Sequence, residues 1–149
     1  MAEGILVRKS TIEDLDEMER LMKELTKNFR QKFFRDQWRM DMEYKYDVGG
    51  IFVAEDTDQG KIIGMILVDV GRDLRTSRII GKIINFIVDP EYRGKGVGSR
   101  LLEMALDFSA ERKAVSVKIN ARRELAGTVE LFKKFGFEEV YMVMEREFS

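Results

Sequence analysis

Apolar residues recur along the chain with two periods, and these predict an alternation of helices and strands. Helical spacing is clearest in the set Leu15, Met18, Leu21, Met22 and Leu25. Ser10 and Glu13 precede this set with the three-residue spacing of a capping box, which predicts that the helix starts at Ser10. Helical spacing returns over 97–111 and over 124–135, just before Gly136, a residue that suits a left-handed helix cap.

Runs rich in β-branched and aromatic residues predict strands. They cover residues 5–7, 50–56, 62–70, 79–88, 114–120 and 137–148. Residues 29–46, which have no clear period, predict a second helix or a helix with a loop. The order of elements is β-α-α-β-β-β-α-β-α-β. It predicts one domain over 1–149 of the α/β (α+β) class, with a mixed, mainly antiparallel sheet flanked by helices.

The overall composition disfavours several classes of partner. The formal net charge is −1 although 36% of the residues are charged, so the chain as a whole has no attraction for nucleic acid or an anionic membrane. No apolar run is long enough to cross a bilayer, and the start lacks the features of a signal peptide. We therefore expect a cytoplasmic protein that binds neither nucleic acid nor membrane.

The chain contains no cysteine and no histidine, which limits its chemistry. Disulfides, thiolate nucleophiles and thiolate metal sites are excluded, and the commonest general base and metal ligand is missing. We expect no metal. Acid–base steps are left to carboxylates, tyrosine, lysine, water or the backbone.

Three glycines lie between the fourth predicted strand, residues 79–88, and the helix predicted over 97–111. The segment that contains them, residues 88–106, reads VDPEYRGKGVGSRLLEMAL. Gly94, Gly96 and Gly98 carry no Cβ, so the N–H groups around them are unshielded, and the helix dipole adds positive potential. Arg93 and Lys95 add two cations. Such a turn binds anions, and phosphates above all.

Two common phosphate motifs do not fit this turn. A Walker A loop requires a lysine followed by Ser or Thr, whereas Lys95 is followed by Gly96. The dinucleotide fingerprint G-x-G-x-x-G requires a third glycine where this chain has Ser99, and no βαβ unit carries an acidic residue about 20 positions further on. An unrelated nucleotide-binding protein is therefore disfavoured.

What remains is the pattern Arg-x-x-Gly-x-Gly at Arg93, Gly96 and Gly98, after a hydrophobic strand and the letters VDPEY. This pattern resembles the central motif, Q/R-x-x-G-x-G/A, of the GNAT acetyltransferase superfamily. LFKKFGF, residues 131–137, resembles L-Y-x-x-x-G-F in the last helix of that family. ILVRKSTIEDLDEMERLM resembles its opening strand and helix, so the resemblance covers essentially the whole chain and implies the GNAT fold. A glycine turn that only packs a helix close to a strand is the alternative.

The resemblance implies acetyl-CoA as co-substrate and acetyl transfer to a primary amine by direct attack. The implied pyrophosphate donors are the loop residues Arg93, Gly94, Lys95, Gly96, Val97, Gly98 and Ser99. Ile87 and Val88 match the position where the family's strand splays from its neighbour at a bulge and binds the pantetheine arm. The Val88 N–H would orient the thioester carbonyl as an oxyanion-type donor. Asp89 and Pro90 are expected to shape the turn, and Tyr92 to pack rather than to contact cofactor.

The chain departs from the family at the position of its usual acid. The tyrosine of L-Y-x-x-x-G-F is Phe132 here, which has no proton to give but is able to pack beside the cofactor. Tyr141, on the last predicted strand, is the nearest substitute, although a half-buried strand tyrosine explains it better. The family often carries an asparagine seven residues earlier, where this chain has Leu125; Asn120 is the candidate for that cofactor contact.

No side chain stands out as the general base. Asn85, on the strand before the loop, is able to hold a water but is not itself a strong base. Asp41, Glu43 and Asp47 could line an amine site, yet a solvated helix face explains them better. The aromatic and basic residues of 29–46 suit a core-packing helix or an acceptor pocket.

Two functions therefore stay open. One is an N-acetyltransferase whose amine acceptor, small molecule or protein, is not identified by the sequence. The other is a non-catalytic acyl-CoA sensor or interaction module with the same fold, which the missing tyrosine favours. The alternating segment 137–148 could pair with the edge of a second subunit, so a homodimer is also left open.

Overall fold

A computed structural model of the protein describes residues 4–28, 33–121 and 126–148. The chain divides into two compact units, Met1–Lys118 and Ile119–Ser149. The expectation of a single domain over the whole chain stays a prediction.

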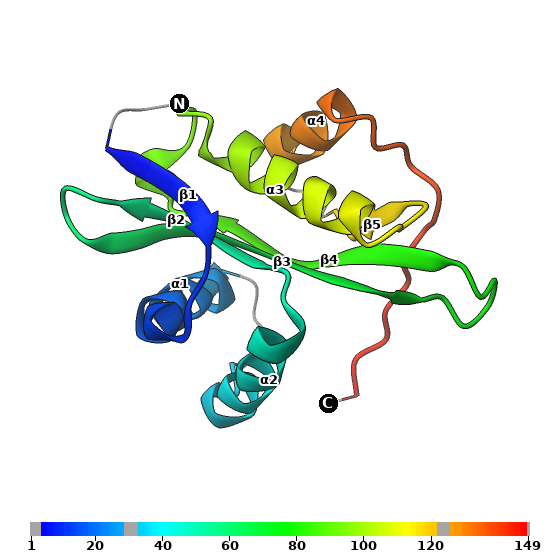
Figure 1. Ribbon diagram of the computed structural model, residues 1–149, viewed down its shortest axis with the longest axis horizontal. Coiled ribbons are helices and arrows are strands. Elements are labelled where there is room, and N and C mark those ends of the chain that lie inside the picture. Colours follow the sequence, from blue (N-terminus) through cyan, green and yellow to red (C-terminus); the bar gives the residue numbers. More distant parts are fainter. Residues whose placement is uncertain (1–3, 29–32, 122–125, 149) are drawn as a thin grey trace. The chain divides into compact units, whose positions relative to one another are not determined.

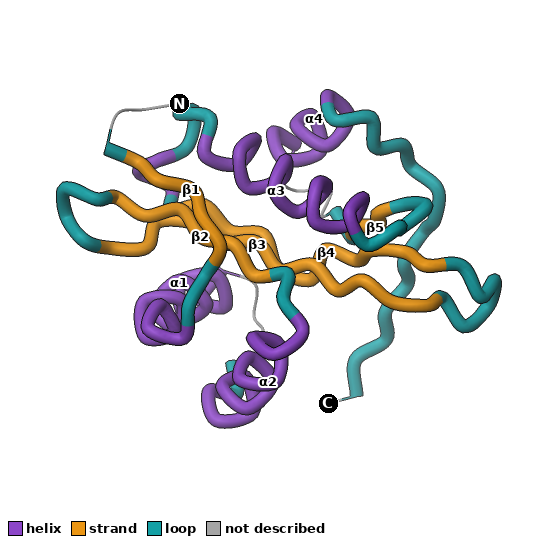
Figure 2. Tube along the Cα trace, viewed as in Figure 1, coloured by secondary structure: helices purple, strands orange, loops and turns teal. Residues whose placement is uncertain are grey.

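The sheet has the strand order β1-β2-β3-β4-β5. The strands are β1 (Ile5–Lys9), β2 (Ile51–Asp56), β3 (Lys61–Arg72), β4 (Ile79–Val88) and β5 (Val117–Ile119). Neighbouring strands from β1 to β4 pair antiparallel, and Figure 2 traces β3 and β4 as a long hairpin. Beside the start of β4, the Val115 N–H donates to the Ile79 carbonyl at 2.8 Å. The structure confirms the expected class, α/β with a mainly antiparallel sheet.

Three helices of the first unit cover the two faces of this sheet. They are α1 (Leu15–Asn28), α2 (Arg35–Val48) and α3 (Val97–Glu111). Figure 1 shows α1 and α2 on one face and α3 on the other. The second unit contains α4 (Ala126–Lys134). None of the described helices is long and apolar enough to span a membrane.

The face under α1 holds a buried hydrophobic cluster. Leu15, Met18, Leu21 and Met22 of the predicted stripe are buried there, with Leu15 at 4% exposure and Met18 at 0%. Its partners in the cluster are Met42 of α2 and the strand residues Ile51, Val53, Ile62, Met65, Leu67 and Ile87. The sheet thus buries these four residues of the apolar stripe that the sequence predicts.

Two glycines let α3 lie close to the other face. A Cβ on Gly64 would come within 3.1 Å of Leu101 Cδ1, and a Cβ on Gly81 within 2.8 Å of Ser109 Oγ. Leu101 and Ser109 are both almost fully buried. Any larger side chain on β3 or β4 at these two positions would push the helix away.

The first helical turn starts one residue later than the sequence predicts. A short 3-10 turn, η1, covers Ile12–Asp14 and leads into α1. Asp14, not Glu13, accepts the backbone N–H of the capping residue, which is Thr11 at 2.9 Å. Arg8 fixes Asp14 in this place with two hydrogen bonds of 2.8 Å. The prediction of Ser10 as the cap was therefore wrong. The two hydrogen bonds from Arg8 hold the Asp14 carboxylate where it accepts the Thr11 N–H, so the capping residue is Thr11.

The C-terminal end differs more. Residues 137–148 form no strand, and Val143 and Met144 are 67% and 86% exposed. Alternating apolar and polar residues form a strand only where another strand is available to pair with them. Among the described residues of the second unit, the segment pairs with no strand. The helix before it is confirmed over Ala126–Lys134, and Gly136 takes the expected left-handed conformation with φ +88°. The stretch 29–46 resolves into α2, which begins at Arg35; residues 29–32 lie outside the described part of the chain.

Candidate active site

One extra residue in β4 sets the geometry of the site. Leu67 of β3 lies opposite Asn85, but the next residue, Val68, lies opposite Ile83. Ile84 is thus a β-bulge, and its side chain is 49% exposed. The bulge changes the face of the sheet toward which odd-numbered residues of β4 point. Gly81, before the bulge, lies against α3, whereas Ile87, after it, belongs to the core under α1.

The bulge also decides where the backbone of Val88 points. The Asp89 N–H donates to the Ile63 carbonyl of β3 at 2.8 Å. Backbone groups of successive residues alternate between the two edges of a strand, so Ile87 also directs its N–H to β3 and Val88 directs its N–H away from β3. The predicted oxyanion-type donor is therefore turned toward the edge of β4 that β3 does not occupy. Ile87 itself is 9% exposed and packs in the core.

A tight turn connects Val88 to the glycine-rich loop. The Asp89 carboxylate accepts the Glu91 N–H at 3.0 Å, and Pro90–Tyr92 form a 3-10 turn, η2. This confirms that Asp89 and Pro90 shape the turn. Gly94 and Gly96 then take φ of +79° and +81°, the left-handed region that glycine enters without strain, and α3 begins at Val97.

The loop presents a row of backbone donors. The first backbone bond that reaches back from α3 runs from the Arg100 N–H to the Gly96 carbonyl at 3.2 Å. Among the described residues, the N–H groups from Gly94 to Ser99 have no acceptor. A Cβ on Gly94 would meet nothing within 4 Å, so the approach to the loop at Gly94 is open. Unpaired donors at the start of a 15-residue helix form an anion site.

Tyr92 fixes the glycine-rich loop to the end of β2. Tyr92 is 8% exposed, and its hydroxyl donates to the carboxylate of Asp56 at the end of β2. This hydrogen bond, with burial, raises the pKa of Tyr92 to about 12, and the same bond lowers the pKa of Asp56. At neutral pH the hydroxyl keeps its proton and the carboxylate is charged, so the bond is charge-assisted. The expectation that Tyr92 packs is confirmed.

The cations of the loop lie at its surface. Arg93 and Lys95 are exposed, and the Lys95 ammonium lies 5.2 Å from the centre of the Tyr92 ring. The ammonium of Lys61 lies 5.8 Å from the same ring centre. Asp56 and Lys61 are not recognisable as part of the site from the sequence, because both come from the hairpin of β2 and β3, more than thirty positions before the loop.

The predicted candidates for proton transfer are spread over several elements. Asn85 is partly buried on β4, on the face that α1 and α2 cover, directly after the bulge. Asp41, Glu43 and Asp47 are exposed on α2, as a solvated helix face requires. Sequence reasoning overlooked Glu19 of α1, which is 8% exposed and accepts a 2.8 Å hydrogen bond from Arg39 of α2.

Three predicted site residues belong to the second unit. Phe132 is 4% exposed, and its ring centre lies 5.7 Å from that of Phe137. Asn120 is exposed, and Tyr141 is 58% exposed in the segment that forms no strand. The role of each toward the cofactor stays a prediction, and Leu125 lies outside the described residues.

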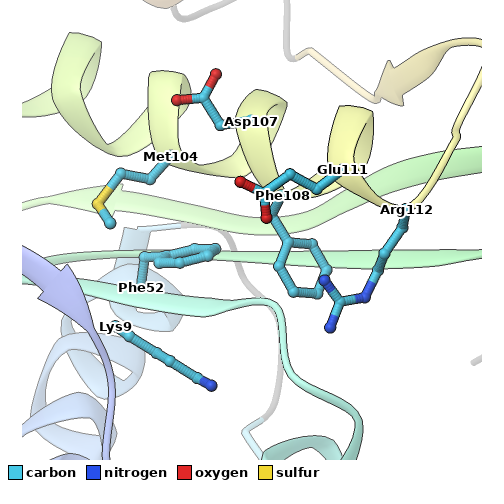
Figure 3. A pocket seen from close by; sticks show the side chains of 7 residues that line it. All are labelled: Lys9, Phe52, Met104, Asp107, Phe108, Glu111 and Arg112. Carbon is cyan, nitrogen blue, oxygen red and sulfur yellow. The ribbon is translucent and has the colours of Figure 1, made fainter.

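A separate hollow of about 360 Å³ lies beside the C-terminal half of α3, at the other end of the helix from the loop. Its lining residues are Lys9, Phe52, Met104, Asp107, Phe108, Glu111 and Arg112. Figure 3 shows the rings of Phe52 and Phe108 flanked by the cationic side chains of Lys9 and Arg112. No residue predicted from the sequence for the site lines this hollow.

Comparison with known proteins agrees with this geometry. The model of the acetyltransferase (GNAT) family matches residues 15–137. An uncharacterized N-acetyltransferase of Methanocaldococcus jannaschii is 28% identical over 142 residues, which cover 92% of this chain and 62% of that protein. The chain therefore spans less than two thirds of the length of this relative.

Two solved structures have a similar fold. Glucosamine-6-phosphate N-acetyltransferase from Arabidopsis thaliana superposes with a TM-score of 0.81 at 23% identity, covering 99% of this chain and 100% of that chain. AAC(6')-Iy in complex with the bisubstrate analog CoA-S-monomethyl-acetylneamine superposes with a TM-score of 0.80 at 18% identity, covering 97% of this chain and 98% of that chain.

Proposed function

This chain belongs to the acetyltransferase (GNAT) family, and from that premise we propose that it transfers an acetyl group from acetyl-CoA to a primary amine. The observation that carries the proposal is the row of N–H groups from Gly94 to Ser99 at the start of α3, which lack an acceptor among the described residues. A pyrophosphate supplies the acceptors that this row lacks. The solved complex of AAC(6')-Iy contains a CoA-based bisubstrate analog, which supports the same choice of donor.

In the proposed reaction the amine nitrogen forms a bond to the acetyl carbon while the carbon–sulfur bond breaks. Negative charge develops on the carbonyl oxygen, and the Val88 N–H, turned away from β3, is the donor placed to stabilise it. With its pyrophosphate on the loop, a donor molecule is held beside Val88 at the end of β4. Holding both reactants there supplies part of the rate by proximity.

Two protons have to move. The amine loses one, and Asn85, three residues before Val88, is the polar side chain of β4 placed to hold a water that accepts it. The departing thiolate gains one. Phe132 cannot donate a proton, and the hydroxyl of Tyr141 is the candidate that the sequence offers. The thiolate is a tolerable leaving group, so turnover does not depend on a dedicated acid.

A non-catalytic acyl-CoA-binding module is the second candidate. The observation that favours it is Phe132, a buried phenyl ring packed on Phe137 at the position where the family often has its acid. Both candidates require the same phosphate site. They differ only in turnover.

The experiment that separates them follows free thiol release. The protein is incubated with acetyl-CoA and a panel of amines, from amino acids and polyamines to aminoglycosides and peptides with free N-termini. We expect thiol release above background with at least one amine, and a higher melting temperature with CoA by mass action. CoA binding without thiol release for any member of the panel would favour the binding module and reject the transferase.

Two further proposals concern the protein as a whole. We infer that it works in the cytoplasm, on an amine acceptor and without nucleic acid or membrane. The apolar side chains exposed over 137–148, such as Met142 at 75%, suit a homodimer contact. Light scattering of the full chain tests this, since a monomer at all concentrations rejects the dimer.

A further inference from the structure

The glycine-rich loop is joined to a part of the chain that the family motif does not include. The Tyr92 hydroxyl at the end of η2 donates to the Asp56 carboxylate at the end of β2. Both residues are 8% exposed, so the contact is almost dry. A hydrogen bond between a hydroxyl and a shielded carboxylate is among the stronger contacts available to a loop.

The carboxylate of Asp56 is itself held firmly. It accepts the N–H of Asp58 at 3.0 Å and the N–H of Gln59 at 3.2 Å, and the Asp56 carbonyl accepts the Gly60 N–H at 2.8 Å. The turn between β2 and β3 is thus ordered by its own bonds. Tyr92 therefore anchors the loop to a rigid support rather than to a mobile side chain.

The same turn brings a cation to the loop. Lys61 is the first residue of β3, and its ammonium lies 5.8 Å from the centre of the Tyr92 ring, while that of Lys95 lies at 5.2 Å. No ion pair joins Lys61, Lys95 or Arg93 to a carboxylate within the described part of the chain. Lys61 also attracts the Asp56 carboxylate by charge, and the carboxylates of Asp89 and Glu91 lie close enough to act on Tyr92. The three cations beside unpaired N–H groups still offer an anion more than one positive partner.

We propose that the turn between β2 and β3 forms a second wall of the phosphate site: Asp56 positions the glycine-rich loop through Tyr92, and Lys61 binds phosphate together with Arg93 and Lys95. This inference rests on the proposed function, since it names further residues of that same site. Tyr92 and Asp56 are positioning residues, because they act through the loop backbone. Lys61 is a binding residue, because its ammonium reaches the ligand by charge.

The test measures CoA binding to the full chain by calorimetry at low and at high salt. The variants are Tyr92→Phe, Asp56→Asn and their double variant, with Lys61→Gln, Lys61→Arg and, as control, Lys113→Gln. Tyr92→Phe keeps the ring over which both ammoniums lie and removes only the hydroxyl. Lys113 is exposed just beyond the far end of α3 and matches Lys61 in charge only.

We expect Tyr92→Phe to weaken CoA binding about tenfold, the usual size for one hydrogen bond to a charged group. Asp56→Asn should weaken it less, because the amide oxygen still accepts the Tyr92 hydroxyl but without charge assistance. The double variant should lose no more than Tyr92→Phe alone, because both changes act on the same contact. Lys61→Gln should weaken binding up to about fivefold at low salt and little at high salt, because salt screens this charge. Lys61→Arg should retain binding, and Lys113→Gln should equal the wild type.

The outcomes separate the two proposals. A wild-type chain that does not bind CoA overturns the proposed function. A wild type that binds CoA while Tyr92→Phe and Lys61→Gln bind equally well overturns this inference alone. Additive losses in the double variant, or a Lys61→Gln loss that salt does not reduce, would show a general effect on folding and would also overturn it.

Discussion

Arg39 of α2 donates a hydrogen bond of 2.8 Å to Glu19 of α1. Arg35 and Lys23 also pair with this carboxylate, at 2.8 Å and 3.2 Å, although Glu19 is only 8% exposed. The hydrogen bond from Arg39 is the largest of the influences that lower the pKa of Glu19 to about 2. The cluster joins the two helices that cover one face of the sheet, so the acidity of Glu19 reports on their packing.

The first prediction concerns pH. The folded pKa of Glu19 lies below its ordinary value of 4.5, so its stabilisation is complete above about pH 5 and is lost as the pH falls toward about 2. Glu19→Gln should lower the melting temperature at neutral pH and reduce the further loss between those pH values. Calorimetric scans across that range measure both. The control is Glu103→Gln, an exposed α3 residue paired with Arg100; an unchanged acid slope in Glu19→Gln would contradict the prediction.

The second prediction concerns the loop. Gly96 has φ +81°, so Gly96→Val forces a β-branched residue into a region that costs roughly 1–2 kcal/mol or more. It also places a side chain among the phosphate donors. We expect CoA affinity to fall more than tenfold. Gly136→Val is the matched control, since Gly136 has φ +88° and open space around it, so it should lose similar stability and keep its affinity. Equal affinity in both variants would exclude the loop from the site.

The third prediction concerns the approach of α3 to the sheet. A Cβ on Gly64 would lie 3.1 Å from Leu101 Cδ1 and 3.3 Å from the Ile87 carbonyl oxygen. Gly64→Ala should therefore cost about 1–3 kcal/mol in the free energy of unfolding and weaken CoA binding, because the start of α3 moves. Denaturant titration measures the first effect. Gly71→Ala on the same strand, where a Cβ would meet nothing within 4 Å, should leave stability almost unchanged.

The fourth prediction concerns the missing acid. Phe132→Tyr introduces a hydroxyl at a side chain that is 4% exposed, so we expect a lower melting temperature unless the hydroxyl finds a partner. If that position acts as it does in many family members, kcat for acetyl transfer should rise. Thiol release under saturating substrates measures this. A kcat equal to that of the wild type would mean that the thiolate leaves without help from this position.

The local pattern of apolar residues was enough to predict much of the fold. The stripe beginning at Leu15 and the helix over 97–111 depend on side-chain period, which is a property of neighbouring residues, and the structure has both. The loop glycines were found for the same reason. Segment 137–148 shows the opposite case, because alternation is also local but a strand needs a partner far along the chain, and no such pairing forms there.

The contacts that were missed all join distant parts of the sequence. Asp56 and Tyr92 are separated by 36 positions, and Arg39 and Glu19 by 20. Nothing in the residues around Asp56 distinguishes it from an ordinary turn aspartate. Only the packing of the β2–β3 turn under the loop gives it a role, and that packing is a result of the whole fold.

The β-bulge at Ile84 shifts the alternation of side chains along β4 by one residue. Upstream of it, odd-numbered residues such as Gly81 lie under α3; downstream, odd-numbered residues such as Ile87 lie under α1. Deleting this one residue would restore a uniform register, and either the core side chain of Ile87 or the outward N–H of Val88 would then be on the wrong side. The length of this strand is therefore under tighter constraint than its composition, and a single-residue deletion here should be more damaging than most substitutions of Ile84 itself.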